Sequence, residues 1–143
     1  MKKIFLLGLF LVLSVSCSRD EYTYYNPYLP EMNVYLMINL NLPSYAVLNY
    51  VNNSILETSQ GINGVIVHNT GMGFVAYDAT CSNHAITAGS ALTVNGQLAS
   101  CNHCDREYFL LNGQPTSETE TSQYFLKPYL VNVSGNVLTI SNY

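Results

Sequence analysis

Short apolar runs separated by turn-forming residues constrain the fold of this chain more than any other feature. From Val34 onward, β-branched and aromatic residues cluster in runs that Gly, Asn, Pro and Ser interrupt. This pattern predicts strands joined by tight turns. Asn95-Gly96, Asn112-Gly113 and Gly135-Asn136 stand between runs, where hairpins require such residues. We therefore expect an all-β, antiparallel domain, built as a sandwich or as small barrels.

The individual strands can be placed from these runs. Only residues 43–51 offer a short helical alternative. The expected strands cover residues 34–40, 47–51, 65–68, 74–78, 91–94, 97–100, 108–111, 130–133 and 137–141.

The N-terminus has the pattern of an export signal. Residues 1–16 combine a basic start with an apolar stretch that is too short for a permanent membrane span. Small residues directly before Cys17 resemble a bacterial lipobox, which implies cleavage there and lipidation of the Cys17 sulfur. The alternative is an ordinary secretion signal with an incidental cysteine. We expect a lipoprotein signal peptide (1–16), a lipid-anchored tether (17–32) and a β domain (33–143).

This division predicts a bacterial cell-envelope protein, held at the outer membrane on its periplasmic or surface face. The whole chain has a formal net charge of −4. Removal of residues 1–16 takes away Lys2 and Lys3 but no acidic residue, so the charge becomes −6. No basic stripe remains to bind phosphates, which argues against nucleic acid as a partner.

Three cysteines remain after Cys17 is assigned to lipid, and they lie close to histidines. The spacing is Cys-x2-His at Cys81 and His84, followed by Cys-x2-Cys at Cys101 and Cys104. Ligands three positions apart can bind one ion through a tight turn, and two such turns form a closed site of four ligands. The alternative is a disulfide, Cys101 with Cys104 or Cys81 with Cys101, which leaves one thiol unpaired.

The remaining histidines have weaker assignments. His103 lies inside the second Cys-x2-Cys segment and is an alternative ligand, a hydrogen-bond donor to sulfur or an exposed residue. His68 is expected at the surface, at the end of a strand. No serine stands in a nucleophile turn, so we assign no catalytic residue and do not expect an enzyme that acts by itself.

Three segments together resemble the Rieske 2Fe-2S domain, most closely the secreted Rieske-like lipoproteins of Bacteroidota. They are GFVAYDATCSNHA, CNHCDREYFLLNGQP and YFLKPYLVNVSGNVLTI, and the resemblance covers the chain from about Val34 to Tyr143. It implies a Rieske-like antiparallel β sandwich or pair of small barrels. Two ligand loops would form a metal-binding tip on that fold.

The ligand set departs from the family pattern. The first family loop reads Cys-x-His and the second Cys-x-x-His, and Cys81 and Cys101 match the two cysteines. Asn83 and Cys104 occupy the two histidine positions. Ala85 and Asp105 stand near the positions where the family usually has glycine. Exchange of a neutral imidazole for a thiolate adds negative charge and lowers the potential of an iron-sulfur cluster.

The resemblance implies an electron-transfer lipoprotein with a 2Fe-2S cluster, serving as the electron-transfer component of an oxidoreductase with an unknown redox partner. The alternative is an envelope lipoprotein that keeps the fold, carries a structural zinc ion or a disulfide, and serves as a binding component without redox activity. Both readings expect Cys81, His84, Cys101 and Cys104 at the site and a membrane anchor at Cys17.

Overall fold

The computed structural model describes residues 24–117 and 124–143. The predicted signal peptide, Cys17 and the first part of the predicted tether lie outside these residues. Among the described residues, no helix has both the length and the hydrophobicity needed to span a membrane.

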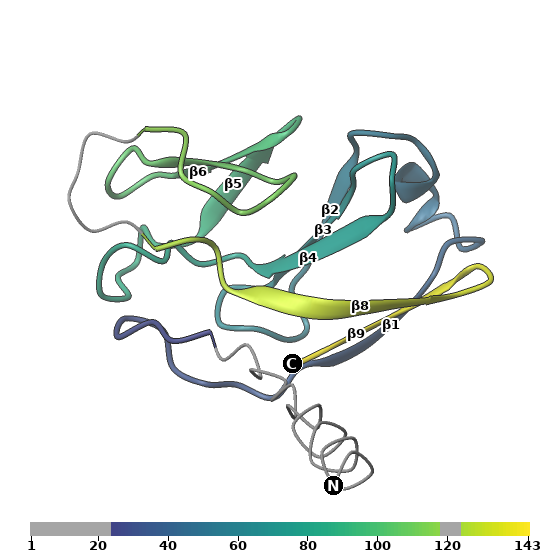
Figure 1. Ribbon diagram of the computed structural model, residues 1–143, viewed down its shortest axis with the longest axis horizontal. Coiled ribbons are helices and arrows are strands. Elements are labelled where there is room, and N and C mark those ends of the chain that lie inside the picture. Colours follow the sequence, from purple (N-terminus) through teal and green to yellow (C-terminus); the bar gives the residue numbers. More distant parts are fainter. Residues whose placement is uncertain (1–23, 118–123) are drawn as a thin grey trace, which may run out of the picture.

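A six-stranded antiparallel sheet forms the larger part of the described structure (Figure 1). The hairpin between its last two strands turns at Gly135 and Asn136, as the sequence predicts, because Ser134 and Val137 are paired across it. In spatial order the strands are β1 (Tyr35–Asn39), β9 (Val137–Ser141), β8 (Pro128–Ser134), β4 (Phe74–Asp78), β3 (Val65–Asn69) and β2 (Ser54–Glu57).

A three-stranded antiparallel sheet carries the Cys/His-rich part of the sequence. It has the order β5 (Leu92–Asn95), β6 (Leu98–Cys101) and β7 (Glu107–Phe109). The chain passes from β4 into this sheet through the segment 79–91. A bridge between Thr80 and Ala91 closes that segment at its base. Figure 1 shows β5 and β6 at one end of the molecule, away from the β8–β9 turn.

Two hydrophobic cores lie on the two sides of β3. Val65 and Val67 belong to the first core, on one face of the large sheet, whereas Ile66 belongs to the second. Successive side chains of a strand point to opposite faces, so one strand can serve both cores. The second core lies under the small sheet and consists of Ile66, Tyr77, Ala79, Cys81, Leu92, Ala99, Cys101, Tyr108, Leu110 and Leu126. Two of the predicted metal ligands are therefore core residues.

The all-β antiparallel prediction is confirmed, with two local corrections. The predicted strand at 47–51 is wrong, because Ala46–Asn49 forms a 3₁₀ helix, η2, whose Leu48 is buried in the first core. In addition, β2, a four-residue strand at the edge of the large sheet, was not predicted from the sequence. A short edge strand carries little alternation, so its pairing with β3 decides its conformation.

His68 is not at the surface, contrary to the expectation. It lies in β3 and is 1 % exposed, because β3 is covered on both faces. Its Nδ1 lies 2.8 Å from Oγ of Ser54, the residue opposite it in β2. Burial lowers the pKa of His68. The imidazole is thus a neutral core group whose hydrogen bond links the edge strand to its neighbour.

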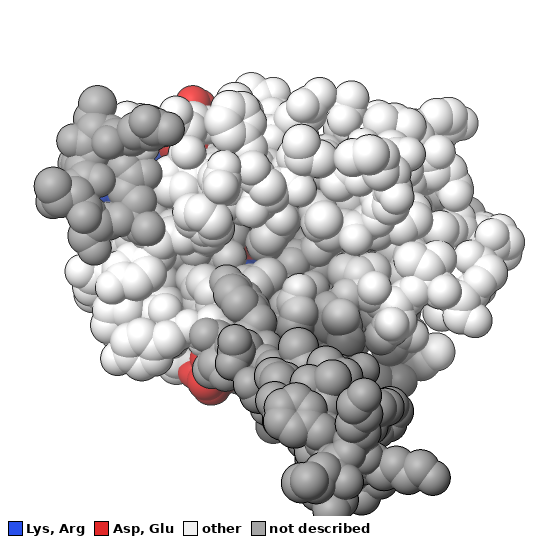
Figure 2. Space-filling view, in the orientation of Figure 1, with Lys and Arg blue, Asp and Glu red and all other residues white. Residues whose placement is uncertain are grey.

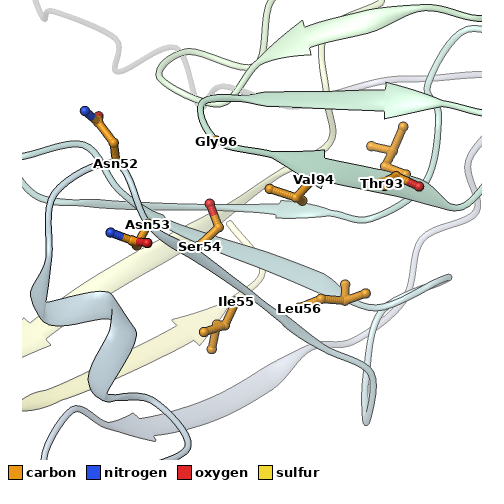
Figure 3. A pocket seen from close by; sticks show the side chains of 9 residues that line it. Asn52, Asn53, Ser54, Ile55, Leu56, Thr93, Val94 and Gly96 are labelled. Carbon is orange, nitrogen blue, oxygen red and sulfur yellow. The ribbon is translucent and has the colours of Figure 1, made fainter.

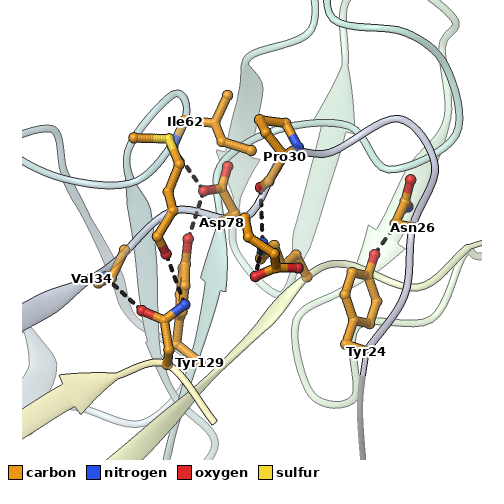
Figure 4. A network of polar contacts seen from close by, with 11 residues as sticks. Tyr24, Asn26, Pro30, Val34, Ile62, Asp78 and Tyr129 are labelled. Atoms are coloured by element: carbon orange, nitrogen blue, oxygen red, sulfur yellow. Dashed lines mark hydrogen bonds and ion pairs between the residues drawn. The ribbon is translucent and has the colours of Figure 1, made fainter.

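Asp78 connects the end of β4 to two other parts of the fold. Its Oδ2 accepts hydrogen bonds from the hydroxyl of Tyr129 and the backbone N–H of Ile62, both at 2.8 Å (Figure 4). The carboxylate is fully buried. Because Asp78 lies three positions before Cys81, these bonds fix the point from which the first Cys/His segment departs.

Substitution of Gly113 by alanine will destabilise the fold more than the same change at Gly96. Both glycines have positive φ (+73° and +61°), but a Cβ at Gly113 would lie 2.9 Å from the buried Tyr77 ring, whereas Gly96 faces open space. The backbone strain costs about 1–2 kcal/mol at either site. The clash adds about 1–3 kcal/mol at Gly113. Denaturant unfolding of both variants measures the difference, and equal losses would contradict this packing.

Candidate metal centre

Two loops bring the four predicted ligands together. The first loop follows β4 and carries Cys81 and His84, and the second begins at Cys101, the last residue of β6, and carries Cys104. One ligand atom from each of the four lies within 4.8 Å of every other. No other Cys, His, Asp or Glu joins this group among the described residues.

Backbone hydrogen bonds shape each loop. The N–H of Cys81 donates to Ser90 O at 2.8 Å and so closes the first loop. In the second loop, the N–H of Asp105 donates to Cys101 O at 3.0 Å, and Asp105 has a positive φ of 56°. Asp105 stands near a position where the Rieske pattern usually has glycine. Aspartate adopts this left-handed conformation more readily than most residues, so the tight turn forms without glycine.

Two pairs of donor atoms lie close together within the group. The sulfurs of Cys81 and Cys104 lie 3.7 Å apart, and Nε2 of His84 lies 3.3 Å from the sulfur of Cys101. Zinc–ligand bonds of about 2.0–2.3 Å place neighbouring ligand atoms of a tetrahedron about 3.5–3.8 Å apart, so the sulfur–sulfur distance lies in this range and the nitrogen–sulfur distance is slightly shorter.

The surroundings of two free thiols shift their pKa values in opposite directions. Cys81 is 0 % and Cys101 is 1 % exposed, and both are free thiols. Burial raises the pKa of Cys81. Burial also opposes ionisation of Cys101, but hydrogen bonds from His84 and from the N–H groups of His103 and Cys104 outweigh it and lower its pKa. A buried thiolate is costly without a cation, and a bound metal ion supplies that charge.

His84 is oriented for ligation. Its Nδ1 lies 2.8 Å from the carbonyl oxygen of Ala85, which can only accept a hydrogen bond, so Nδ1 carries the proton. Nε2 faces the sulfur of Cys101, so it donates a hydrogen bond to that sulfur when the ring is charged and presents its lone pair to a metal ion when the ring is neutral. Burial lowers the pKa of His84, but its bonds to Cys101 and Ala85 outweigh burial and raise it. Such a backbone contact to the second ring nitrogen is typical of metal-binding histidines.

Asn83 does not act as a ligand, although it occupies a histidine position of the Rieske pattern. Its Nδ2 donates to the Tyr108 hydroxyl and to Tyr124 O, both at 2.8 Å, and its Oδ1 accepts from Tyr124 N at 2.7 Å. The Tyr108 hydroxyl lies 3.1 Å from the sulfur of Cys81. Asn83 and Tyr108 therefore form an outer layer of polar contacts beside the ligand group.

His103 lies next to the group but outside it. Its ring centroid is 4.6 Å from that of His84, with the planes tilted by 51°, and its side chain is exposed. A Cβ at Gly89 would lie 3.2 Å from Cβ of His103, so this glycine allows the two loops to pack closely. The structure thus brings the four main candidates together and leaves the alternative, His103, as a neighbour of His84.

A pocket of about 460 Å³ lies apart from this group, between the edge strands β2 and β5 (Figure 3). Its lining is uncharged and contains none of the four candidate ligands. It consists of Asn52, Asn53, Ser54, Ile55, Leu56, Leu92, Thr93, Val94 and Gly96.

Comparison of the sequence with known protein families and with curated proteins finds no match. Comparison with solved structures does find similar folds. A chain in the complex of reduced oxygenase and oxidised ferredoxin of carbazole 1,9a-dioxygenase matches with a TM-score of 0.51 and 19 % identity. The match covers 75 % of this chain and 92 % of that one.

Two ferredoxins match with a TM-score of 0.45 each. The Sphingomonas yanoikuyae B1 ferredoxin is 12 % identical over 66 % of this chain and 89 % of its own. The ferredoxin of carbazole 1,9a-dioxygenase from Nocardioides aromaticivorans IC177 is 16 % identical over 68 % and 93 %. At these identities the likeness concerns the fold alone. The chain has a fold like that of Rieske-type ferredoxins, as its sequence predicts, with a group of three cysteines and one histidine at its tip.

Proposed function

We propose that this chain is a metal-binding protein that holds one tetrahedral metal ion with Cys81, His84, Cys101 and Cys104. The observation that carries the proposal is the convergence of four donor atoms within 4.8 Å, two of them on buried thiols. Three thiolates and one imidazole form a common closed zinc site. Zinc is the ion that this donor set fits best, and its role is to hold the two loops together.

The Rieske ligand set of two cysteines and two histidines does not fit these residues. Asn83 is engaged with Tyr108 and Tyr124, and the other histidine position is Cys104. The described residues place a single histidine, His84, in the group. A centre at this tip therefore has more thiolate character than the one that the Rieske pattern specifies.

Electron transfer through iron is the second candidate, and the fold favours it. The matched structure contains a ferredoxin and an oxygenase of carbazole 1,9a-dioxygenase, and the match covers most of the chain that was matched there. A 2Fe-2S cluster held by the same four side chains would supply one-electron chemistry. Three thiolates would give it a lower potential than a set with two imidazoles. The partner would then be a redox protein.

We propose a cellular location for this protein as well. The apolar stretch before Cys17 supports export and a lipid anchor in the bacterial envelope, with the domain facing the periplasm or the surface. The view in Figure 2 shows a face with few charged side chains. This sparse charge agrees with a partner other than nucleic acid.

Metal content and visible absorption of the full chain, extracted without chelators, test both candidates. The zinc proposal expects a colourless protein with one zinc ion per chain. Iron together with acid-labile sulfide, and a coloured protein, would overturn zinc and establish the second candidate. A protein that holds no metal, and in which two of the cysteines form a disulfide, would contradict both the zinc and the iron candidates.

The zinc affinities of two alanine variants will show whether His84 or His103 is the ligand. His84→Ala removes one of four donors and should weaken zinc binding by more than the roughly 10–100-fold typical of outer contacts. His103→Ala should leave affinity close to that of the unmodified chain, because His103 lies outside the group. Competition with a coloured chelator measures both values. A larger effect at His103 would make it the ligand.

The Tyr108 hydroxyl should tune the centre without binding the metal. Tyr108→Phe removes the contact with the Cys81 sulfur, and zinc affinity should fall by about 10-fold, the low end for outer-layer contacts. Tyr77→Phe, which removes a hydroxyl from the same core, serves as the control. Equal effects of the two changes in the chelator competition would show that general packing, not the sulfur contact, is responsible.

A further inference from the structure

The segment 24–31, called here the N-terminal strap, is fastened to the first ligand loop. It belongs to the described part of the predicted tether. In Figure 1 this dark segment runs beneath the teal loop that follows β4. Asn26 and Leu29 are both buried at 6 % exposure. The strap is therefore packed against the domain at these two residues.

Asn26 makes the contact between the strap and the loop. Its Nδ2 donates to Ser82 O at 2.8 Å, and its Oδ1 accepts from Tyr28 N at 2.8 Å. Ser82 is fully buried and stands between the ligand Cys81 and the outer-layer residue Asn83. One amide side chain thus stabilises a turn in the strap and holds the backbone next to a ligand.

A second contact reaches the same loop by way of residues 124 and 125. The Tyr24 hydroxyl donates to Phe125 O at 2.8 Å, and the rings of Tyr28 and Tyr124 meet edge to face with centroids 5.9 Å apart. Figure 4 shows Tyr24 and Asn26 side by side. Tyr124 in turn pairs with the Asn83 amide. The strap therefore supports the first loop directly and through the outer layer.

The far end of the strap is anchored away from the ligands. Nζ of Lys127 donates to Pro30 O and Glu31 Oε2, both at 3.0 Å, and the Lys127 side chain is only 4 % exposed. Beyond the strap, Asn142 donates to Met32 O at 2.7 Å and accepts from Val34 N. The Lys127 contacts hold the end of the strap, whereas the Asn142 contacts hold the chain that follows it.

We propose that the strap controls how long the centre retains its metal ion, with Asn26 as the positioning residue that holds the first ligand loop closed. This inference rests on the proposed metal binding. Release of an ion requires Cys81 and His84 to move away from Cys101 and Cys104. The bond from Asn26 to Ser82 resists that movement at the residue next to Cys81.

Asn26→Asp tests the inference with a nearly isosteric change. It keeps the oxygen that accepts from Tyr28 N and removes the donor to Ser82 O and to the Tyr24 hydroxyl. We expect zinc to leave the full chain about 10-fold faster when a chelator is added, within the range for outer contacts.

Asn142→Asp is the matched control. It also loses one amide donor to a backbone carbonyl and keeps an acceptor for a backbone N–H, but it lies beyond the strap. Its zinc release should stay at the rate of the unmodified chain. Release from Asn26→Asp at the unmodified rate, or equally fast release from both variants, would overturn the inference.

Hydrogen exchange of the metal-free chain separates this inference from the proposed function. Exchange in residues 81–85 should be faster in Asn26→Asp than in Asn142→Asp, because the strap holds this loop without help from a metal. Similar exchange in the two variants would count against the strap. Failure of the unmodified chain to take up zinc would overturn the proposed function instead, while the exchange comparison would still report on Asn26.

Discussion

The burial of two thiols beside an imidazole and a third sulfur is the interaction on which the rest of this structure depends. Cys81 and Cys101 lie in the second core with exposed fractions of 0 % and 1 %, so neither sulfur is solvated by water. Polar groups in such a place need a partner, and anionic sulfur needs a positive one. The core, the two loops and the outer layer are all arranged around these side chains.

The ends of two strands determine where the ligand loops begin. The first loop leaves β4 just after Asp78, which is held by Tyr129 and Ile62, and the second starts at the end of β6. A bridge between Thr80 and Ala91 sets the base of the first loop. Rigid strands thus fix where each loop begins, and short backbone hydrogen bonds fix how each loop turns.

Much of this could be read from the sequence, because strand period and ligand spacing are local properties. The runs that became β3, β4 and β9 are strongly β-branched or aromatic, and Cys-x2-His and Cys-x2-Cys each act within one turn. Local pattern was insufficient for β2, whose conformation depends on pairing with β3. The local pattern also gave a wrong prediction for His68, a polar residue near the end of a strand, because both faces of that strand are covered.

The sequence by itself determined the antiparallel β architecture, the identity of the candidate ligands and their division between two loops, since all of these follow from residue order and spacing. Only the tertiary structure decided that His84 joins the group while His103 stays beside it, and that Asn83 binds two tyrosines. It also decided that Asn26 reaches Ser82 across 56 positions of the chain. Contacts between residues so far apart depend on how the sheets pack, and no local pattern encodes that packing.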